Sequence, residues 1–190
     1  MRDFVISLRS IIILWIVTVV IYPVLILAIG QVGFSDQANG SLITNNEGKV
    51  VGSAIIGQTF TSEQYFWSRP SSVSYSEGSD ASPTGISGAS NLAPDNPELL
   101  SRIETEAQRL DNEGVKPIAD LLYASGSGLD PHISPAAARV QIERIANRRQ
   151  ISPSEIEQLV QQYTEGRFLG IFGEPGVNVL RLNLALDNIS

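Results

Sequence analysis

The sequence contains no cysteine and a single histidine, His132. The first absence excludes disulfide bonds and thiol chemistry, and the second excludes a histidine-rich metal centre. Lysine and arginine form no long runs, which argues against a nucleic-acid-binding surface. The sequence also lacks a Walker-type phosphate loop with its lysine and the G-x-S-x-G turn of many hydrolases. We therefore predict neither catalytic residues nor a metal site in this chain.

One long apolar segment, residues 11–29, contains no charged residue, and 14 of its 19 members are Ile, Leu or Val. As an α-helix it would span about 28 Å, close to the thickness of the hydrocarbon core of a bilayer. A cleavable signal peptide is the alternative, but its apolar region has only about 7 to 15 residues. We therefore expect a retained transmembrane helix over residues 11–29.

The charges that flank this helix predict its orientation. Arg2 and Arg9 precede it, whereas the next basic residue is Lys49. Because positive charge stays on the cytoplasmic side, we expect a cytoplasmic segment, 1–10, and an extracytoplasmic domain, 30–190, of a single-pass protein in the inner (plasma) membrane. The domain has a net charge of −8, obtained by removing the three charged residues before the helix from the chain's total of −7. Such a surface attracts cations weakly.

The pattern of residue types after the helix predicts one α+β domain with a small, mainly antiparallel sheet and about three to four helices. Two early strands are expected at residues 41–44 and 49–56, and two late strands at 168–172 and 177–182. Residues 61–96 are rich in small polar residues and form a long polar loop region. A loop of this length is either functional or an ordinary solvated insertion.

Three helices are expected after this loop, each beginning at a capping residue followed by proline. They run from Asn96 to Gly114, from Ser134 to Arg149 and from Ser152 to Gly166. The third has the clearest start, because Ser152 and Glu155 form the pattern of a capping box.

A short segment rich in serine and glycine, residues 125–132, is the most unusual stretch of the sequence. Its two glycines permit close backbone approach, so successive amides could bind a phosphate or another anion. The segment also contains the residue types of a Ser-His-Asp triad, but they are too close in sequence for that geometry. The alternative is a rigid corner that leads into the helix start at Ser134. The candidate nucleotide-binding or partner-binding residues are Ser125, Gly126, Ser127, Gly128, Asp130 and His132.

Arg69 follows two aromatic residues, Phe66 and Trp67. A cation among aromatic side chains either anchors a partner or stacks locally. We keep both interpretations open at this stage.

A set of motifs follows the N-terminal anchor in a fixed order: Gln37-Ala38-Asn39-Gly40-Ser41-Leu42, Gly52-Ser53 with Ile56-Gly57-Gln58, Phe66-Trp67-Ser68-Arg69-Pro70-Ser71, Ser90-Asn91-Leu92, residues 125–137, Val177-Asn178-Val179-Leu180 and residues 182–187. Together with the anchor, this set resembles the C subunit of the Kdp potassium-transporting ATPase over nearly the whole chain. Two positions depart from the pattern: Ala93 stands where glycine is expected, and Ser35-Asp36 replaces a proline-containing lead-in.

The resemblance implies a subunit of a high-affinity, ATP-driven potassium uptake complex that has no catalytic site of its own. Its implied partners are a potassium-channel-like subunit, a P-type ATPase subunit and a small single-helix subunit. It implies a role in assembly and as a catalytic chaperone that raises the ATP affinity of the ATPase subunit. ATP and potassium are then handled by the complex, and no cofactor is expected on this chain.

The partner-interface candidates on this interpretation are Asn39, Gln58, Trp67, Arg69 and Asn91. Two alternatives remain open. One is a membrane-anchored nucleotide-binding regulator that uses the loop from Ser125 to Gly128, and the other is an exported, membrane-tethered hydrolase.

Overall fold

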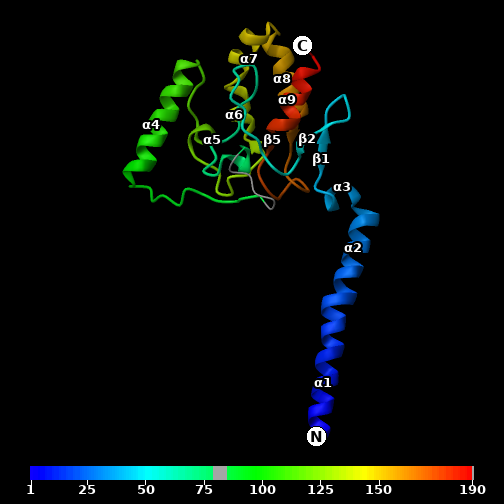
Figure 1. Ribbon diagram of the computed structural model, residues 1–190. Helices are drawn as coiled ribbons and strands as arrows, with labels where there is room; N and C mark the ends of the chain where they lie inside the picture. Colours follow the sequence, from blue (N-terminus) through cyan, green and yellow to red (C-terminus); the bar gives the residue numbers. More distant parts are fainter. Residues whose placement is uncertain (79–84, 190) are drawn as a thin grey trace. The chain divides into compact units, whose positions relative to one another are not determined.

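The computed structural model describes residues 1–78 and 85–189, and the chain divides into two compact units, Met1–Leu42 and Ile43–Ser190 (Figure 1). The first unit is largely one helical rod. Its elements are α1 (Arg2–Trp15), η1 (Ile16–Ile21), α2 (Tyr22–Gly33) and the short α3 (Ser35–Ala38).

The rod from Arg2 to Gly33 is long and apolar enough to cross a membrane, with a mean hydropathy of 2.9 over an 18-residue window. Its middle part, η1, is a π-helix that lies directly before Pro23. Proline has no amide hydrogen and its ring crowds the carbonyl four residues earlier, and a widened turn accommodates both effects. The rod therefore continues through the proline as one span.

The second unit begins with a two-stranded sheet of β1 (Leu42–Thr44) and β2 (Val50–Ser53). The Asn45 side chain closes the connecting turn by accepting hydrogen bonds from the amides of Glu47 and Lys49, at 3.1 and 3.0 Å. Both early strands are thus confirmed. The second ends at Ser53 rather than at residue 56, because a Ser53–Ile56 bridge turns the chain there.

The central sheet has three short strands, β3 (His132–Ile133), β4 (Thr164–Glu165) and β5 (Gly176–Asn178). Their order is β3-β5-β4, and both pairings are antiparallel. His132 pairs with Asn178, and Thr164 pairs with Val177. The expectation of a small antiparallel sheet in an α+β domain is confirmed.

The helices of the second unit are η2 (Ser74–Ser76), α4 (Pro97–Asn112), α5 (Ala119–Leu122), α6 (Pro135–Arg139), α7 (Ile142–Arg149), α8 (Pro153–Gln162) and α9 (Val179–Asp187). All three predicted helix starts are confirmed. Asn96 accepts a hydrogen bond from the amide of Glu98 at 2.8 Å, Ser134 caps α6, and Ser152 and Glu155 form the capping box of α8.

Two predicted helix extents are wrong. The segment from Ser134 to Arg149 is not one helix, because the chain turns between α6 and α7 at Gln141, whose buried side chain is used for bonds to another segment. The next helix ends at Gln162 rather than near Gly166, because Thr164 and Glu165 join the sheet as β4.

The first late strand is wrong, and the second is confirmed only for Val177 and Asn178, which belong to β5. Residues 168–172 form a closed loop in which Phe168 and Phe172 bridge. Most of 177–182 is helix α9, because the Asn178 side chain caps its first turn by accepting from the amide of Arg181 at 3.1 Å. The apolar residues of this segment are buried at helical spacing along one side of α9.

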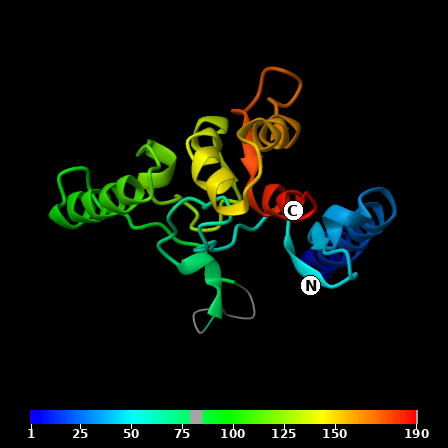
Figure 2. The same ribbon diagram turned by 90° about the horizontal axis from the view of Figure 1, so that it is seen from above.

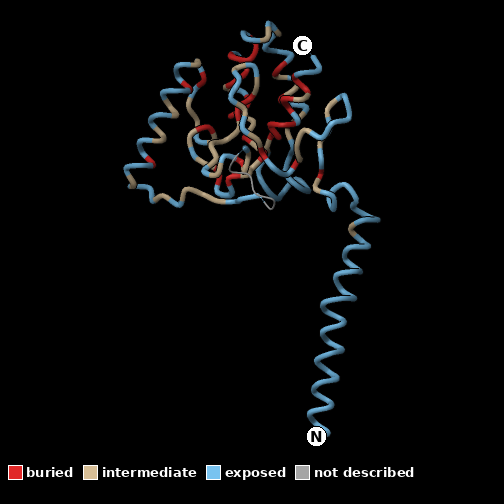
Figure 3. The backbone as a smooth tube through the Cα atoms, viewed as in Figure 1, coloured by how far each residue is buried: buried red, intermediate tan, exposed pale blue. Residues whose placement is uncertain are grey.

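The hydrophobic core of the second unit lies mainly among β5 and the helices α6 to α9, where many buried residues gather in Figure 3, and it includes Leu110 of α4, Leu121 of α5 and Ile133 of β3. Phe66 and Trp67 belong to this core although they come from the loop region 61–96. That region contains only the short helix η2 in its described residues, and residues 79–84 of it lie outside the described part.

Candidate functional site

The segment from Ser125 to Gly128 forms a tight turn that faces into the domain. Ser125 and Gly128 are buried, whereas Gly126 and Ser127 are exposed. The Ser125 hydroxyl accepts hydrogen bonds from the amides of Ser127 and Gly128, at 3.3 and 3.1 Å. The Ser127 hydroxyl accepts from the amide of Leu129 at 3.1 Å. The three successive amides that an anion would need are therefore already bonded within the turn.

The loop that precedes this turn in the chain is joined to it by hydrogen bonds. Ser71 donates its hydroxyl to the carbonyl of Gly128 at 2.7 Å, and the amide of Gly88 donates to the carbonyl of Ser127 at 2.8 Å. Gly128 has a φ of +68°, and a Cβ atom there would lie 2.5 Å from Val73 and 2.6 Å from the carbonyl of Gly88. Only glycine fits this position.

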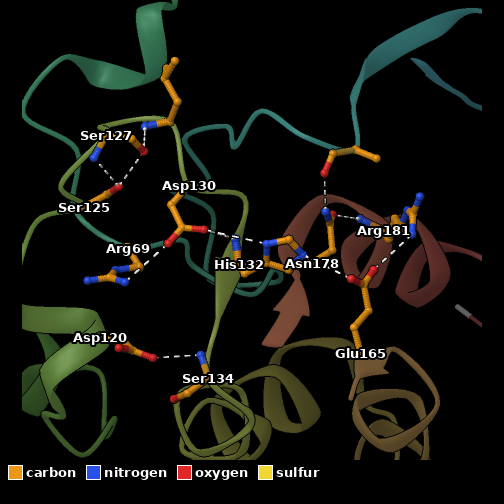
Figure 4. Close-up of polar contacts among 12 residues, drawn as sticks. Arg69, Asp120, Ser125, Ser127, Asp130, His132, Ser134, Glu165, Asn178 and Arg181 are labelled. Atoms are coloured by element: carbon orange, nitrogen blue, oxygen red, sulfur yellow. Dashed lines mark hydrogen bonds and ion pairs between the residues drawn. The ribbon is translucent and has the colours of Figure 1, made fainter. Parts of the chain in front are cut away.

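His132 lies between two carboxylates and not beside the serines (Figure 4). Its Nδ1 is 3.7 Å from Asp130, and its Nε2 is 3.5 Å from Glu165. The hydroxyls of Ser125 and Ser127 instead contact one another at 3.1 Å. Among the contacts of the described residues, the two serines and His132 do not form the hydrogen-bonded chain of a catalytic triad.

The ionisable side chains around His132 stabilise one another's charged forms. Contact with Asp130 raises the pKa of His132 despite its partial burial, and Glu165 adds to this effect. The same contact with His132 lowers the pKa of Asp130, helped by Arg69 at 3.4 Å. Glu165 also binds Arg181 at 3.1 Å. These charges join β3 to β4 at the edges of the central sheet.

An open cavity of about 650 Å³ borders this charged cluster. Its lining includes Arg69, Asp120, Asp130, His132, Glu165 and Glu174. Asp120 is used structurally, because its carboxylate accepts the amide of Ser134 at 2.8 Å at the start of α6. Within residues 1–78 and 85–189, no group of three or more His, Cys, Asp or Glu side chains is arranged to hold a metal ion.

The cations that stack on Trp67 are Arg144 and Arg109, 3.6 and 4.2 Å from the centre of its ring. Arg69 instead pairs with Asp130. Arg144 is buried, which lowers its pKa to about 10, and it donates to Gln141 at 2.9 Å and to the carbonyls of Glu63 and Tyr65. Trp67 is thus held by two arginines from the helices, and the local stacking considered for Arg69 is replaced by an ion pair with Asp130. The interpretation of Arg69 as a partner anchor stays a prediction.

Two buried amide side chains fix the loop region to the helices, and sequence reasoning missed both. Gln141 accepts from the amide of Trp67 at 2.8 Å, and Asn183 accepts from the amide of Phe66 at 2.8 Å. Each also donates back to the carbonyl of the same residue, at 3.3 and 3.0 Å. An amide group within an apolar stripe was the available signal, because a buried amide must find partners.

The remaining partner candidates are placed as follows. Asn39, in the first unit, donates to the carbonyl of Ser35 at 2.6 Å and is exposed. Gln58 is half-buried and donates to the carbonyl of Val51 at 2.7 Å. Asn91 is exposed with a φ of +53°. Of these three, Asn39 and Asn91 present their side chains to solvent.

These features define a class of protein with one candidate membrane-spanning helix and one small α+β domain. A family model described as "KdpC: K+-transporting ATPase, c chain" matches residues 4–188. The chain therefore belongs to the KdpC family of potassium-transporting ATPase subunits, in agreement with the resemblance drawn from its motifs.

Its relatives support the same assignment. The "Potassium-transporting ATPase KdpC subunit" of a Synechocystis species is 71% identical over 187 residues, which cover 98% of each chain. The "Potassium-transporting ATPase KdpC subunit 2" of a Nostoc species is 60% identical over 98% of this chain and 94% of its own. A relative from Paraburkholderia phytofirmans is 50% identical over 91% of this chain and 90% of its own.

Proposed function

We propose that this chain is a non-catalytic accessory subunit that stabilises the assembly of an ATP-driven potassium uptake complex. The observation that carries the proposal is the match to the K+-transporting ATPase c chain over residues 4–188, which includes both the apolar rod and the folded domain. The partners are the channel-like subunit, the P-type ATPase subunit and the small single-helix subunit that the family resemblance implies.

The rod anchors the chain once in the plasma membrane, with the N-terminus in the cytoplasm. The positions of Arg2 and Arg9 before the rod, with Lys49 as the next basic residue, support this orientation. The folded domain then lies outside the cell, against the channel-like subunit, where its acidic surface gathers potassium weakly.

The absence of a catalytic role is supported by the bonds of the serines. The hydroxyls of Ser125 and Ser127 accept hydrogen bonds from backbone amides, and His132 faces two carboxylates. The same bonds argue against direct ATP binding by the turn. Any increase in the ATP affinity of the ATPase subunit is then transmitted through the rod and the neighbouring subunits.

Deletion of residues 11–29 tests the assembly role. We expect this deletion to abolish co-purification of the chain with the other subunits. The control replaces 11–29 with an unrelated apolar helix of the same length and flanking charge, which separates loss of anchoring from loss of a specific helix contact. Undiminished co-purification of the deleted chain would contradict the proposal.

A second experiment tests the indirect effect on ATP. We expect the complex that lacks this chain to have a higher KM for ATP, and the complex with Ser127→Ala to have an unchanged KM. The purified chain alone should show no rise in its melting temperature at millimolar ATP. Such a rise would favour the alternative of a nucleotide-binding regulator, and a reporter fused after Ser190 that is found in the cytoplasm would contradict the orientation.

A further inference from the structure

Residues 168–172 form a loop whose large apolar side chains face solvent. Phe168, Leu169, Ile171 and Phe172 are 62% to 74% exposed. Single exposed apolar residues are common on soluble surfaces, but four within five consecutive positions form a continuous patch. The loop connects β4 to β5 and projects from the domain beyond the sheet (Figure 2).

The loop has a fixed shape. The amide of Phe168 donates to the carbonyl of Phe172 at 2.8 Å, and the amide of Phe172 donates back to Phe168 at 3.0 Å. Below this pair, Arg167 and Glu174 form an ion pair at 2.9 Å. A segment that is ordered before it binds loses little conformational entropy on binding, which favours tight association.

Leu169 sits in this loop with a φ of +53°. Left-handed backbone is unfavourable for leucine by about 1 to 2 kcal/mol, and asparagine or glycine is the usual residue there. The leucine is 74% exposed, so burial within the domain does not offset this cost. A strained residue that contributes little to the fold is a reason to look for a role in binding.

We propose that the loop from Phe168 to Phe172 docks into an apolar pocket on another chain of the potassium-transporting complex. The proposal rests on the proposed function, since it requires that this chain works as a subunit. It assigns the contact to one small surface of the folded domain, in addition to any contact that the rod makes.

The charge around the loop favours a protein pocket over a lipid surface. Apolar loops that enter membranes are flanked by unpaired Lys or Arg, which bind anionic headgroups. Here residues 164–176 contain Glu165, Arg167 and Glu174, and Arg167 is paired with Glu174. Glu165 is in turn paired with Arg181 at 3.1 Å, so the charges of these residues cancel and neither arginine is an unpaired cation for a lipid headgroup. A second copy of this chain is disfavoured for a related reason, because each domain carries a net charge of −8 and repels its like. The pocket is accordingly apolar with an uncharged rim.

Photo-cross-linking in the intact complex tests this proposal. Phe168 is replaced by p-benzoylphenylalanine, and the detergent-purified complex is irradiated and its products are identified by mass spectrometry. We expect a covalent product with one other subunit. The matched control carries the same probe at Leu100, an exposed apolar residue of α4, and should not give that product. Products with lipid or detergent only, with a second copy of this chain only, or no product would overturn the proposal.

A substitution that keeps the loop folded measures how much the contact contributes. Leu169→Asn removes the apolar side chain but suits the left-handed backbone, so the domain should remain folded. We expect the chain to dissociate from the complex at least about tenfold faster, as is typical when a central apolar contact is lost. Leu100→Gln is the control and should leave the rate unchanged. An unchanged rate for Leu169→Asn counts against the docking role, whereas co-purification of the unaltered chain tests the proposed function separately.

Discussion

Two turns of the folded domain use left-handed backbone for opposite purposes. In the turn from Ser125 to Gly128, the serine hydroxyls accept hydrogen bonds from backbone amides of the turn and of Leu129, and Ser71 of the preceding loop donates to the carbonyl of Gly128. The loop from Phe168 to Phe172 closes on itself and directs its side chains into solvent. The turn with the more conspicuous sequence is thus built into the fold, and the less conspicuous one presents an exposed surface.

The physical reason for this difference is the cost of burial. Small polar groups can be buried when each one is hydrogen-bonded, and the turn satisfies that condition for Ser125. Large apolar side chains gain about 25 cal/mol for each Å² removed from water, and the exposed loop forgoes this gain within the domain. The turn rich in serine and glycine therefore stabilises the fold, whereas the exposed apolar loop from Phe168 to Phe172 is suited to binding a partner.

The largest expected effect is a loss of stability when a glycine of each turn is replaced by alanine, and this loss should differ between the two turns. Gly128→Ala forces a Cβ against Val73 and the carbonyl of Gly88, at a backbone conformation that is already unfavourable for alanine. We expect the free energy of unfolding to fall by about 3 kcal/mol or more. Chemical denaturation of the full chain in detergent, followed by near-UV circular dichroism of its aromatic side chains, measures the change.

Gly170→Ala is the matched control. Gly170 has a φ of +74°, and among the described residues no atom lies within 4 Å of a Cβ added there. We expect a loss of only about 1 kcal/mol, due to the backbone alone. Equal losses for the two substitutions would mean that the packing around Gly128 does not constrain it.

The next effect concerns the buried hydroxyl of the turn. Ser125→Ala removes the hydroxyl that accepts from the amides of Ser127 and Gly128, and only the Gly128 amide keeps a second acceptor, the carbonyl of Ser125 at 3.3 Å. We expect a loss of about 1 to 2 kcal/mol of stability. Ser127→Ala should cost less, because Ser127 is exposed and water can replace its hydroxyl. The same denaturation experiment applies. A larger effect for Ser127 than for Ser125 would contradict a structural role for the turn.

A smaller effect follows from the charges beside the turn. The pKa of His132 is raised in the folded state, so its contribution to stability is complete below its ordinary value of 6.5 and is lost as the pH rises through the folded pKa. The pKa of Asp130 is lowered, so its contribution is present above 3.8 and is lost as the pH falls. Their joint contribution is therefore greatest between these two values.

The size of this pH effect is limited by exposure. The side chain of His132 is 36% exposed, and ion pairs that water reaches contribute about 1 kcal/mol or less. We expect His132→Gln to remove the decline in stability on the alkaline side of pH 6.5. The acid side should weaken but persist, because the His132 side chain is the largest cause of the lowered pKa of Asp130, while the backbone amide of residue 132 and Arg69 still lower it. Denaturation at a series of pH values checks this. An unchanged alkaline decline would show that another group causes it.

The two turns also show what the sequence could predict. The helix starts at Asn96, Ser134 and Ser152 were recognisable because a cap is a local pattern of a few residues. The α+β class and the early strand pair were recognisable for the same reason. The structural use of the serines in the turn was one of two open interpretations. The bonds of their hydroxyls to amides of the turn and the contacts from Ser71 and Gly88 favour it, and these depend on the folded chain.

Other features depended on contacts between distant residues. Residues 177–182 alternate enough to resemble a strand, and the cap that Asn178 gives to α9 went unrecognised. The break at Gln141 depends on its bonds to Trp67, which lies 74 residues earlier. The apolar residues at 168–172 predicted a strand, because a short apolar run bounded by turn residues is typical of one. Their exposure was visible only in the folded domain.

The smallest expected effect sharpens the comparison most, because it asks whether the exposed loop matters to the fold. Leu169→Asn relieves left-handed backbone strain and removes a side chain that is 74% exposed, so the free energy of unfolding should stay within about 0.5 kcal/mol of its original value or rise slightly. Denaturation of the full chain outside the complex measures this directly. A loss of more than about 2 kcal/mol would place Leu169 among the residues that hold the domain together. The loop would then resemble the turn at Gly128, and the contrast between a turn that supports the fold and a loop that serves a partner would fail.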